Sequence, residues 1–191
     1  FSSGLGGTSW YNATLAKALV QEGFMTIRRR WSSDWVTGPG GMRTSSCRFA
    51  TVLQWLRSRD WAQGKPLCAT GNSGGASEVA YTLSAQGAGD LLDLAVVTGG
   101  PPMGRLDLGC LGGAAWESEC HELVPQDACP DEQLSCGYTA GAVNLIDSAY
   151  DGTPCAEASA GGDVEQLHLD SVVSPVGVYD YPQTRVHVIE G

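Results

Sequence analysis

The first half of the chain alternates between two patterns of apolar residues. In the first pattern, apolar side chains recur every three or four positions, which predicts amphipathic helices at residues 10–23, 46–59 and 76–86. In the second, short apolar runs predict strands at residues 24–27, 66–70 and 91–98, the last two of them buried. Helices that alternate with buried strands are typical of an α/β fold, in which a mostly parallel sheet is flanked by helices.

Polar residues and glycines mark the ends of the first predicted helix. Thr8 or Ser9 is the expected N-cap, because a hydroxyl can accept a hydrogen bond from a first-turn N–H group. Gly23 is the expected stop, because glycine readily adopts the left-handed conformation that ends many helices. Residues 31–43 are rich in glycine, serine and tryptophan and predict a loop.

The composition changes after the turn Gly99–Pro102. The segment Met103–Asp180 contains five of the seven cysteines, many acidic residues and only fragments of helical periodicity, near residues 114–123, 140–150 and 164–173. Residues 184–189 then predict a final strand. We therefore expect one domain over residues 1–191, with residues 103–180 as a cap or lid insertion that disulfides hold over the sheet.

The charge and hydropathy of the chain exclude two classes of protein. The formal net charge is −10 and the pI is about 4.5, so no basic stripe exists to neutralise the phosphates of a nucleic acid. The only basic cluster, Arg28–Arg30, is expected to form part of a solvated rim. No apolar run approaches the ~18–20 residues that cross a bilayer, so no membrane span is predicted.

The cysteines favour disulfides over a metal site. Seven cysteines are many for a cytosolic enzyme of this size, no two of them form a C-x-x-C pair, and only three histidines accompany them. We therefore expect disulfides in a secreted, extracellular protein, and no metal site. Because the count is odd, one thiol is free or has its partner outside the chain.

The segment Gly71–Gly75, with the sequence Gly-Asn-Ser-Gly-Gly, gives the strongest chemical signal. A buried strand leads into it and an amphipathic helix leaves it, which is the context of a nucleophile elbow. In such a turn, flanking glycines make room for a serine with strained dihedral angles, whose hydroxyl stands above the carboxyl edge of the sheet. Ser73 is therefore the candidate catalytic nucleophile, and the amide of Gly74 is the candidate oxyanion-hole donor.

This strand–turn–helix unit resembles the nucleophile elbow of the α/β-hydrolase superfamily of serine esterases and lipases. The order of elements is similar along nearly the whole chain, so the resemblance implies an α/β-hydrolase fold. Ser3–Gly7 resembles the glycine-rich loop that supplies the second oxyanion donor of this family, with Ser3 where histidine is usual. The resemblance implies that the amide of Leu5 is that second donor.

The resemblance also implies where the rest of the catalytic triad lies. Val186–Gly191 resembles the late strand and turn that precede the acidic residue of the family, whose histidine follows later still. Both partners of Ser73 are therefore expected beyond Gly191. The chain opens on Phe1 as if at the end of a strand, so we expect the fold to be incomplete at both ends of this sequence.

Other titratable residues in the chain are weaker candidates for the acid and the base. His187 alternates with valines in a predicted strand, where packing is the more usual role. Asp180 and Glu190 are carboxylates near the expected edge of the sheet, but neither has the position that the family implies. His121 and His168 fall within the insertion and are predicted to be surface or helix residues.

The insertion has a place in the chain where this superfamily commonly builds a cap over its substrate pocket. Met103, directly after Gly99–Pro102, is a candidate wall of that pocket. Further apolar and aromatic residues of the insertion are candidates to line it: Trp116, Tyr138, Leu145, Ile146 and Tyr150.

The sequence therefore predicts a serine hydrolase that cleaves small carboxylic esters through a covalent acyl-enzyme on Ser73, without a metal or an organic cofactor. The preference for esters is implied by the family alone. Two alternatives remain open: a non-catalytic binding module with the same fold, and a peptidase or thioesterase on the same scaffold. The turn, with Cys68 upstream, also resembles the G-D-S-G-G motif of chymotrypsin-like proteases, but no histidine precedes Ser73 and the surrounding pattern is helical.

Overall fold

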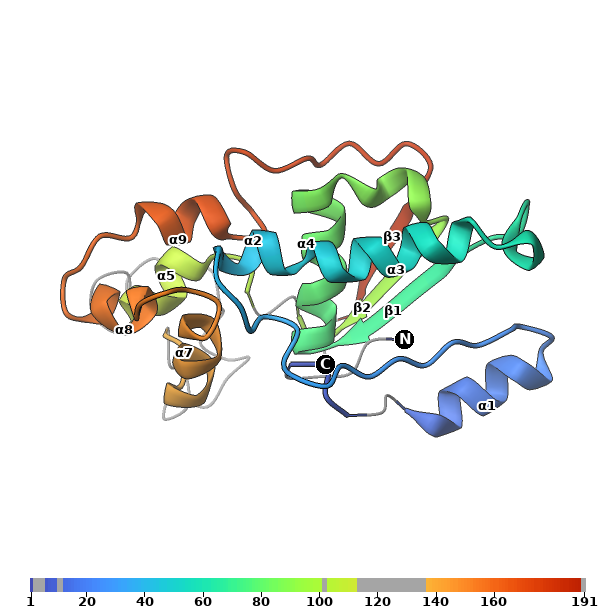
Figure 1. Ribbon diagram of the computed structural model, residues 1–191, viewed down its shortest axis with the longest axis horizontal. Coiled ribbons are helices and arrows are strands. Elements are labelled where there is room, and N and C mark those ends of the chain that lie inside the picture. The colour runs from blue at the N-terminus through green and yellow to red at the C-terminus, as the bar shows by residue number, and fades with distance from the viewer. Residues whose placement is uncertain (2–5, 10–11, 101–102, 113–136, 190–191) are drawn as a thin grey trace, which may run out of the picture.

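A computed structural model describes residues 1, 6–9, 12–100, 103–112 and 137–189 (Figure 1). The elements of the first half are α1 (Ala13–Gln21), α2 (Gly41–Ser45), α3 (Cys47–Arg57), the 3₁₀ helix η1 (Asp60–Ala62), β1 (Cys68–Asn72), α4 (Gly74–Gln86), the 3₁₀ helix η2 (Ala88–Leu91) and β2 (Leu94–Thr98). The elements that follow are α5 (Leu106–Leu111), α7 (Ala140–Asp147), α8 (Pro154–Ser159), α9 (Glu165–Asp170) and β3 (Arg185–Ile189).

The described strands form a three-stranded parallel sheet in the order β1-β2-β3. Asn72, Thr98 and Ile189 lie opposite one another at the carboxyl edge of this sheet. Helices α3 and α4 cover the sheet (Figure 1), and one core unites Leu53 of α3, Val79 of α4 and Val97 of β2. The predicted parallel sheet flanked by helices is thus confirmed for the described part of the chain.

Helix α4 lies at the centre of the molecule because it contributes to two cores. One face of the helix packs on the sheet through Val79 and Leu83. Tyr81, which is fully buried, belongs to a second core with Trp35, Ile146 and Leu167, so it links α4 to the helices after β2. Two faces of α4 are therefore held by long-range packing.

The helix α1 begins at a different residue from the one predicted. Its N-cap is Asn12, whose Oδ1 accepts hydrogen bonds from the amides of Thr14 and Leu15 at 3.0 and 3.1 Å. The expectation of Thr8 or Ser9 as the cap was wrong because the asparagine supplies the same acceptor closer to the apolar stripe. The predicted stop is confirmed: Gly23 has a φ of 88° and its amide donates to the carbonyl of Val20 at 3.1 Å.

The strand predicted at residues 24–27 is also wrong. These residues are extended but belong to no strand, and Phe24 and Met25 are 56% and 66% exposed. An apolar run becomes a strand only where a neighbouring strand offers its hydrogen-bonding groups. The chain's own N-terminal amino group donates to the carbonyl of Ile27 at 3.2 Å, but no strand among the described residues pairs with this segment.

The predicted loop and the predicted basic rim are each corrected in one respect. Helix α2 begins at Gly41, inside the predicted loop, where the Gly41 amide has an acceptor outside its own helix: it donates to the carbonyl of Ala149 at 2.8 Å. In the cluster Arg28–Arg30, the side chain of Arg29 is only 11% exposed and forms an ion pair with Glu78 of α4. The solvated rim predicted for this cluster is therefore wrong for Arg29, because a buried carboxylate needs a cationic partner.

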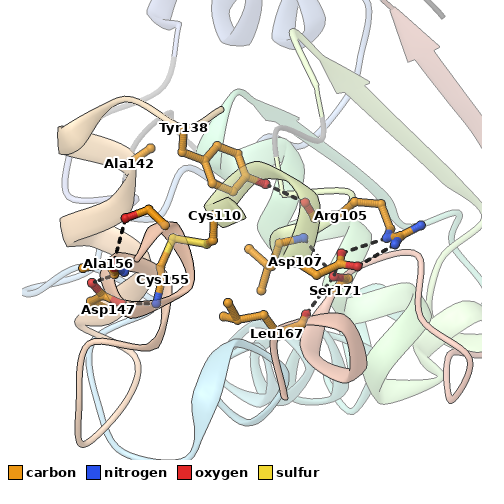
Figure 2. The surroundings of a disulfide bond; sticks show 12 residues. Arg105, Asp107, Cys110, Tyr138, Ala142, Asp147, Cys155, Ala156, Leu167 and Ser171 are labelled. Atoms are coloured by element: carbon orange, nitrogen blue, oxygen red, sulfur yellow. Dashed lines mark hydrogen bonds and ion pairs between the residues drawn. A yellow bond between two sulfur atoms is a disulfide. The ribbon is translucent and has the colours of Figure 1, made fainter. Parts of the chain in front are cut away.

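The helices between β2 and β3 gather at one end of the molecule, at the left of Figure 1. Two of them, α7 and α9, fall within predicted helices, whereas α5 and α8 were not predicted. A disulfide between Cys110 and Cys155 joins α5 to α8 across 45 positions of sequence (Figure 2). The expectation of a disulfide within residues 103–180 is thus confirmed.

The other cysteines divide into two groups. Cys47 and Cys68 are exposed free thiols on α3 and β1. Three cysteines and the helix predicted near residues 114–123 lie outside the described residues: Cys120, Cys129 and Cys136. Across the described ranges, no helix combines the length and the apolar character that a bilayer span requires.

Candidate active site

Ser73 occupies a strained turn between the last residue of β1 and the first residue of α4. Its dihedral angles are φ 51° and ψ −121°, and it is the only non-glycine residue with a positive φ in the described part of the chain. Such a conformation costs on the order of 1–3 kcal/mol and persists only where the surroundings enforce it. Strain of this kind concentrates at functional sites, so the strained turn at Ser73 is the leading candidate for an active site.

Backbone contacts enforce the turn from both sides. The amide of Ser73 donates to the carbonyl of Thr98 at 2.9 Å, which extends the β1–β2 ladder by one residue. The side chain of Asn72 adds hydrogen bonds from Nδ2 to the same carbonyl and to Oγ1 of Thr98, at 3.2 and 3.1 Å. A Cβ at Gly71 would lie less than 3.0 Å from the backbone of Gly75, so the close approach of strand and helix requires glycine there.

The start of α4 provides the electrostatic component of the site. Gly74 is the first residue of this 13-residue helix, and first-turn N–H groups have no acceptor within their own helix. These groups and the positive end of the helix dipole stabilise negative charge next to Ser73. The predicted donor Gly74 thus stands beside the nucleophile, whereas the second predicted donor, Leu5, lies outside the described residues.

A cavity of about 270 Å³ opens next to Ser73. It is lined by Ser73 and Gly74 at the start of α4, by Met103 after β2, and by residues just before and within α7: Tyr138, Thr139, Gly141, Ala142, Leu145 and Ile146. Most of these side chains are apolar. Of the predicted wall residues, four line this cavity, while Trp116 lies outside the described residues and Tyr150 points elsewhere, donating from its hydroxyl to Asp170 at 2.8 Å.

No histidine described in the structure forms a hydrogen bond with Ser73. His187 pairs with Val96 midway along β3, two residues before the carboxyl edge at Ile189. Ser73 is therefore about 10 Å farther along the strand direction and about two strand spacings, again ~10 Å, across the sheet. That separation excludes a direct contact between the imidazole of His187 and the hydroxyl of Ser73.

The remaining candidates for acid and base also stand apart from the serine turn. His168 is on α9, with Nδ1 3.1 Å from the carboxylate of Asp107 on α5. Asp180 is exposed in the segment that leads to β3. His121 and Glu190 lie outside the described residues.

The pair of His168 and Asp107 belongs to a polar cluster that the sequence analysis missed. Burial raises the pKa of Asp107, but the hydrogen bonds and positive charge of Arg105 outweigh it and hold that pKa below its usual value of 3.8. Ser171 completes the cluster: its hydroxyl accepts from the Leu106 amide at 2.8 Å and donates to the Leu167 carbonyl at 2.8 Å (Figure 2).

This cluster fastens α5 to α9 and lies in a different part of the fold from the serine turn. Its members are up to 66 positions apart in sequence, from Arg105 to Ser171, so no local motif signals it. Among the described residues, no group of three or more histidine, cysteine, aspartate or glutamate side chains is arranged to hold a metal ion. Comparison of the whole chain with known protein families, with curated proteins and with solved structures found no match.

Proposed function

We propose that this protein is a serine hydrolase of the α/β-hydrolase type, with Ser73 as its nucleophile. The observation that carries the proposal is the strained conformation of Ser73 at the junction of a parallel strand and a helix. A serine that served only as a helix cap would adopt ordinary extended angles and would accept a hydrogen bond from its own first turn. Here the side chain of Ser73 makes no such capping hydrogen bond.

The proposed reaction is hydrolysis of a carboxylic ester through an acyl-enzyme. Ser73 Oγ forms a bond to the carbonyl carbon and gives its proton to a general base, while the carbonyl electrons move to oxygen. The amide of Gly74 donates to that oxyanion, a contact worth ~3 kcal/mol of barrier in comparable enzymes. Collapse of the intermediate expels the alcohol, which takes the proton from the base, and water then releases the acid by the same steps.

The cavity beside Ser73 supports a small apolar group on the substrate. Its volume of about 270 Å³ suits a short acyl or alcohol moiety, and its walls include Met103, Leu145 and Ile146. The preference for esters over amides comes from the resemblance of the elbow to serine esterases. The same resemblance implies that the carboxylate and then the general base follow Ser73 in chain order.

Labelling with a fluorophosphonate probe tests the nucleophile. In the protein produced from its complete gene, we expect the probe to react with the wild type and not with Ser73→Ala. Ser77→Ala is the matched control, because Ser77 is buried one turn later on α4 and its hydroxyl has no hydrogen-bond partner among the described residues. Labelling that survives Ser73→Ala would remove Ser73 as the nucleophile, and a wild type that never reacts would favour the non-catalytic binding module.

The location of the base can be tested separately. Neither His168 nor His187 contacts Ser73, and the resemblance implies a triad histidine later in the chain than any of the three present. We therefore expect residues 1–191 alone to show no turnover of p-nitrophenyl butyrate above the rate of Ser73→Ala. The protein from the complete gene should hydrolyse the same ester. Turnover by residues 1–191 alone would place the base within this sequence and contradict the expected order of the triad.

A further inference from the structure

Glu78 is a fully buried carboxylate in the middle of α4, five residues after Ser73. Its Oε1 accepts a hydrogen bond from Nε1 of Trp31 at 2.7 Å. Its Oε2 forms an ion pair with Nη2 of Arg29. A carboxylate at this depth is costly unless it is paired, so these partners explain why glutamate is tolerated on a buried face of α4.

The partners of Glu78 are themselves packed into one unit. The guanidinium of Arg29 lies 4.4 Å from the ring centre of Trp31 and 5.1 Å from that of Phe49 on α3. An apolar replacement for a buried ion pair is often equally stable, so net stability is a weak reason for such a unit. Its two hydrogen-bonding directions instead fix where residues 29–31 lie against α4.

Residues 29–35 in turn hold a glycine turn near the start of the chain. The amide of Trp31 donates to the carbonyl of Gly7 at 2.9 Å, and the amide of Trp35 donates to the carbonyl of Gly6 at 2.7 Å. Gly7 has a φ of 77°, and a Cβ there would lie 2.9 Å from the Trp31 ring and 3.0 Å from the Arg29 guanidinium. The turn is therefore seated directly on the two partners of Glu78.

We propose that Glu78 is a positioning residue that couples the Gly6–Gly7 turn to the helix that begins after Ser73. The proposal rests on the proposed function, since the turn directly follows Leu5, the predicted second oxyanion donor. Productive oxyanion geometry tolerates errors of only about 0.5 Å. Helix α4 has Ser73 at its start and Glu78 in its second turn, so one rigid element carries both the nucleophile and the buried anchor of the Gly6–Gly7 turn.

Two variants test this coupling without removing a group that touches substrate. Glu78→Gln keeps the size and an acceptor for Trp31 but removes the charge that faces Arg29. Trp31→Phe keeps an aromatic ring beneath Arg29 and removes the hydrogen bond to Glu78. Asp93→Asn is the control, because it removes the charge from a more exposed ion pair with Arg57, before the start of β2 and away from the carboxyl edge that holds Ser73.

The readout is kcat for p-nitrophenyl butyrate per titrated serine, measured on the protein from its complete gene. The fluorophosphonate burst counts folded, reactive sites, so a purely structural loss lowers the count and leaves kcat per site unchanged. We expect Glu78→Gln to lower kcat per site ~10- to 100-fold with KM within about threefold, as for a misplaced catalytic group. Trp31→Phe should lower kcat per site by a smaller factor of ~3–10, since it removes the hydrogen bond to Glu78 and leaves the ion pair with Arg29 in place.

The outcomes separate this proposal from the proposed function. The proposal stands if at least one folded variant lowers kcat per site more than about threefold while Asp93→Asn does not. If Glu78→Gln fails to fold, the result for Trp31→Phe decides. It falls if neither variant does so, or if the control loses as much. A wild type without a titratable Ser73 would overturn the proposed function, and this inference with it.

Discussion

The serine turn and the helical end of the molecule are stabilised in opposite ways. Around the turn, residues 71–75 and Thr98 hold one another by backbone hydrogen bonds, by the amide side chain of Asn72 and by a close approach that only glycine permits at Gly71. In the helical end, short helices are joined by pairs far apart in sequence, such as Cys110 with Cys155 and Leu106 with Ser171. A strained conformation needs a rigid, continuous frame, whereas short helices with a small shared core need covalent and capping links.

The largest effect on stability is expected from Gly71→Ala, which tests the close packing of β1 against the start of α4. Its Cβ would lie less than 3.0 Å from the carbonyl carbon and oxygen of Gly75, and neither the strand nor the helix can move without losing the ladder. We expect a loss of more than about 4 kcal/mol in the free energy of unfolding. Urea denaturation followed by circular dichroism measures it.

The control for this prediction is Gly152→Ala. An added Cβ at Gly152 meets nothing within 4 Å, and its φ is not positive, so the free energy of unfolding should change by less than about 0.5 kcal/mol. If Gly71→Ala unfolds at the same urea concentration as Gly152→Ala, the turn is looser than the close approach of strand and helix implies.

The strands and the helix that flank the serine turn could be predicted from sequence because their signals are local. The helix at residues 74–86 and the strands on either side follow from apolar spacing within single windows, and glycines mark the turn between them. The error at residues 24–27 has the opposite cause. Strand formation there depends on a partner strand, which a window of apolar residues cannot report.

The second largest effect is expected from loss of the disulfide between Cys110 and Cys155. For a span of 45 residues, the entropy of the unfolded chain limits its contribution to at most about 4 kcal/mol. The double variant Cys110→Ser/Cys155→Ser should therefore unfold at lower urea concentration by an amount equivalent to about 3 kcal/mol. The loss should be concentrated in α5 and α8, as amide hydrogen exchange would report.

The matched control replaces the two exposed free thiols, Cys47→Ser/Cys68→Ser. These thiols form no disulfide, so we expect their replacement to change the free energy of unfolding by less than about 0.5 kcal/mol. Equal losses in the two double variants would show that the helical end does not depend on its disulfide.

A disulfide in the helical end was expected, but its partners could not be predicted, because Cys110 and Cys155 are 45 positions apart and no local pattern joins them. Helix α8 has six residues and no strong periodicity, and it depends on the carboxylate of Asp147 and on the disulfide. The same limit applies to the site. Ser73 and Gly74 follow from a five-residue motif, but Glu78 becomes notable only when Arg29 and Trp31 are seen against it.

A smaller effect is expected from Asp147→Ala, which removes a cap from α8. The carboxylate of Asp147 accepts from the amides of Cys155 and Ala156 at 2.7 and 3.3 Å, in the first turn of that helix (Figure 2). Two first-turn amides would lose their acceptor, at a cost of about 1–2 kcal/mol in the free energy of unfolding. Asp151→Ala, a change at an exposed carboxylate in the loop before α8, is the control. An equal effect of the two changes would contradict the capping role of Asp147.

The smallest effect, and the only gain, is expected from Gly141→Ala in α7. A Cβ at Gly141 meets nothing within 4 Å, in contrast to Gly71, and the residue lies inside a helix without a positive φ. Alanine loses less backbone entropy than glycine on forming a helix, so the free energy of unfolding should rise by about 0.5–1 kcal/mol. Gly141 also lines the cavity beside Ser73, where the added methyl has room. The rate of fluorophosphonate labelling should therefore stay within about twofold of wild type, the change that a weak contact would cause. A loss of stability would mean that α7 packs as closely as the serine turn does, and the contrast between the two regions would not extend to this helix.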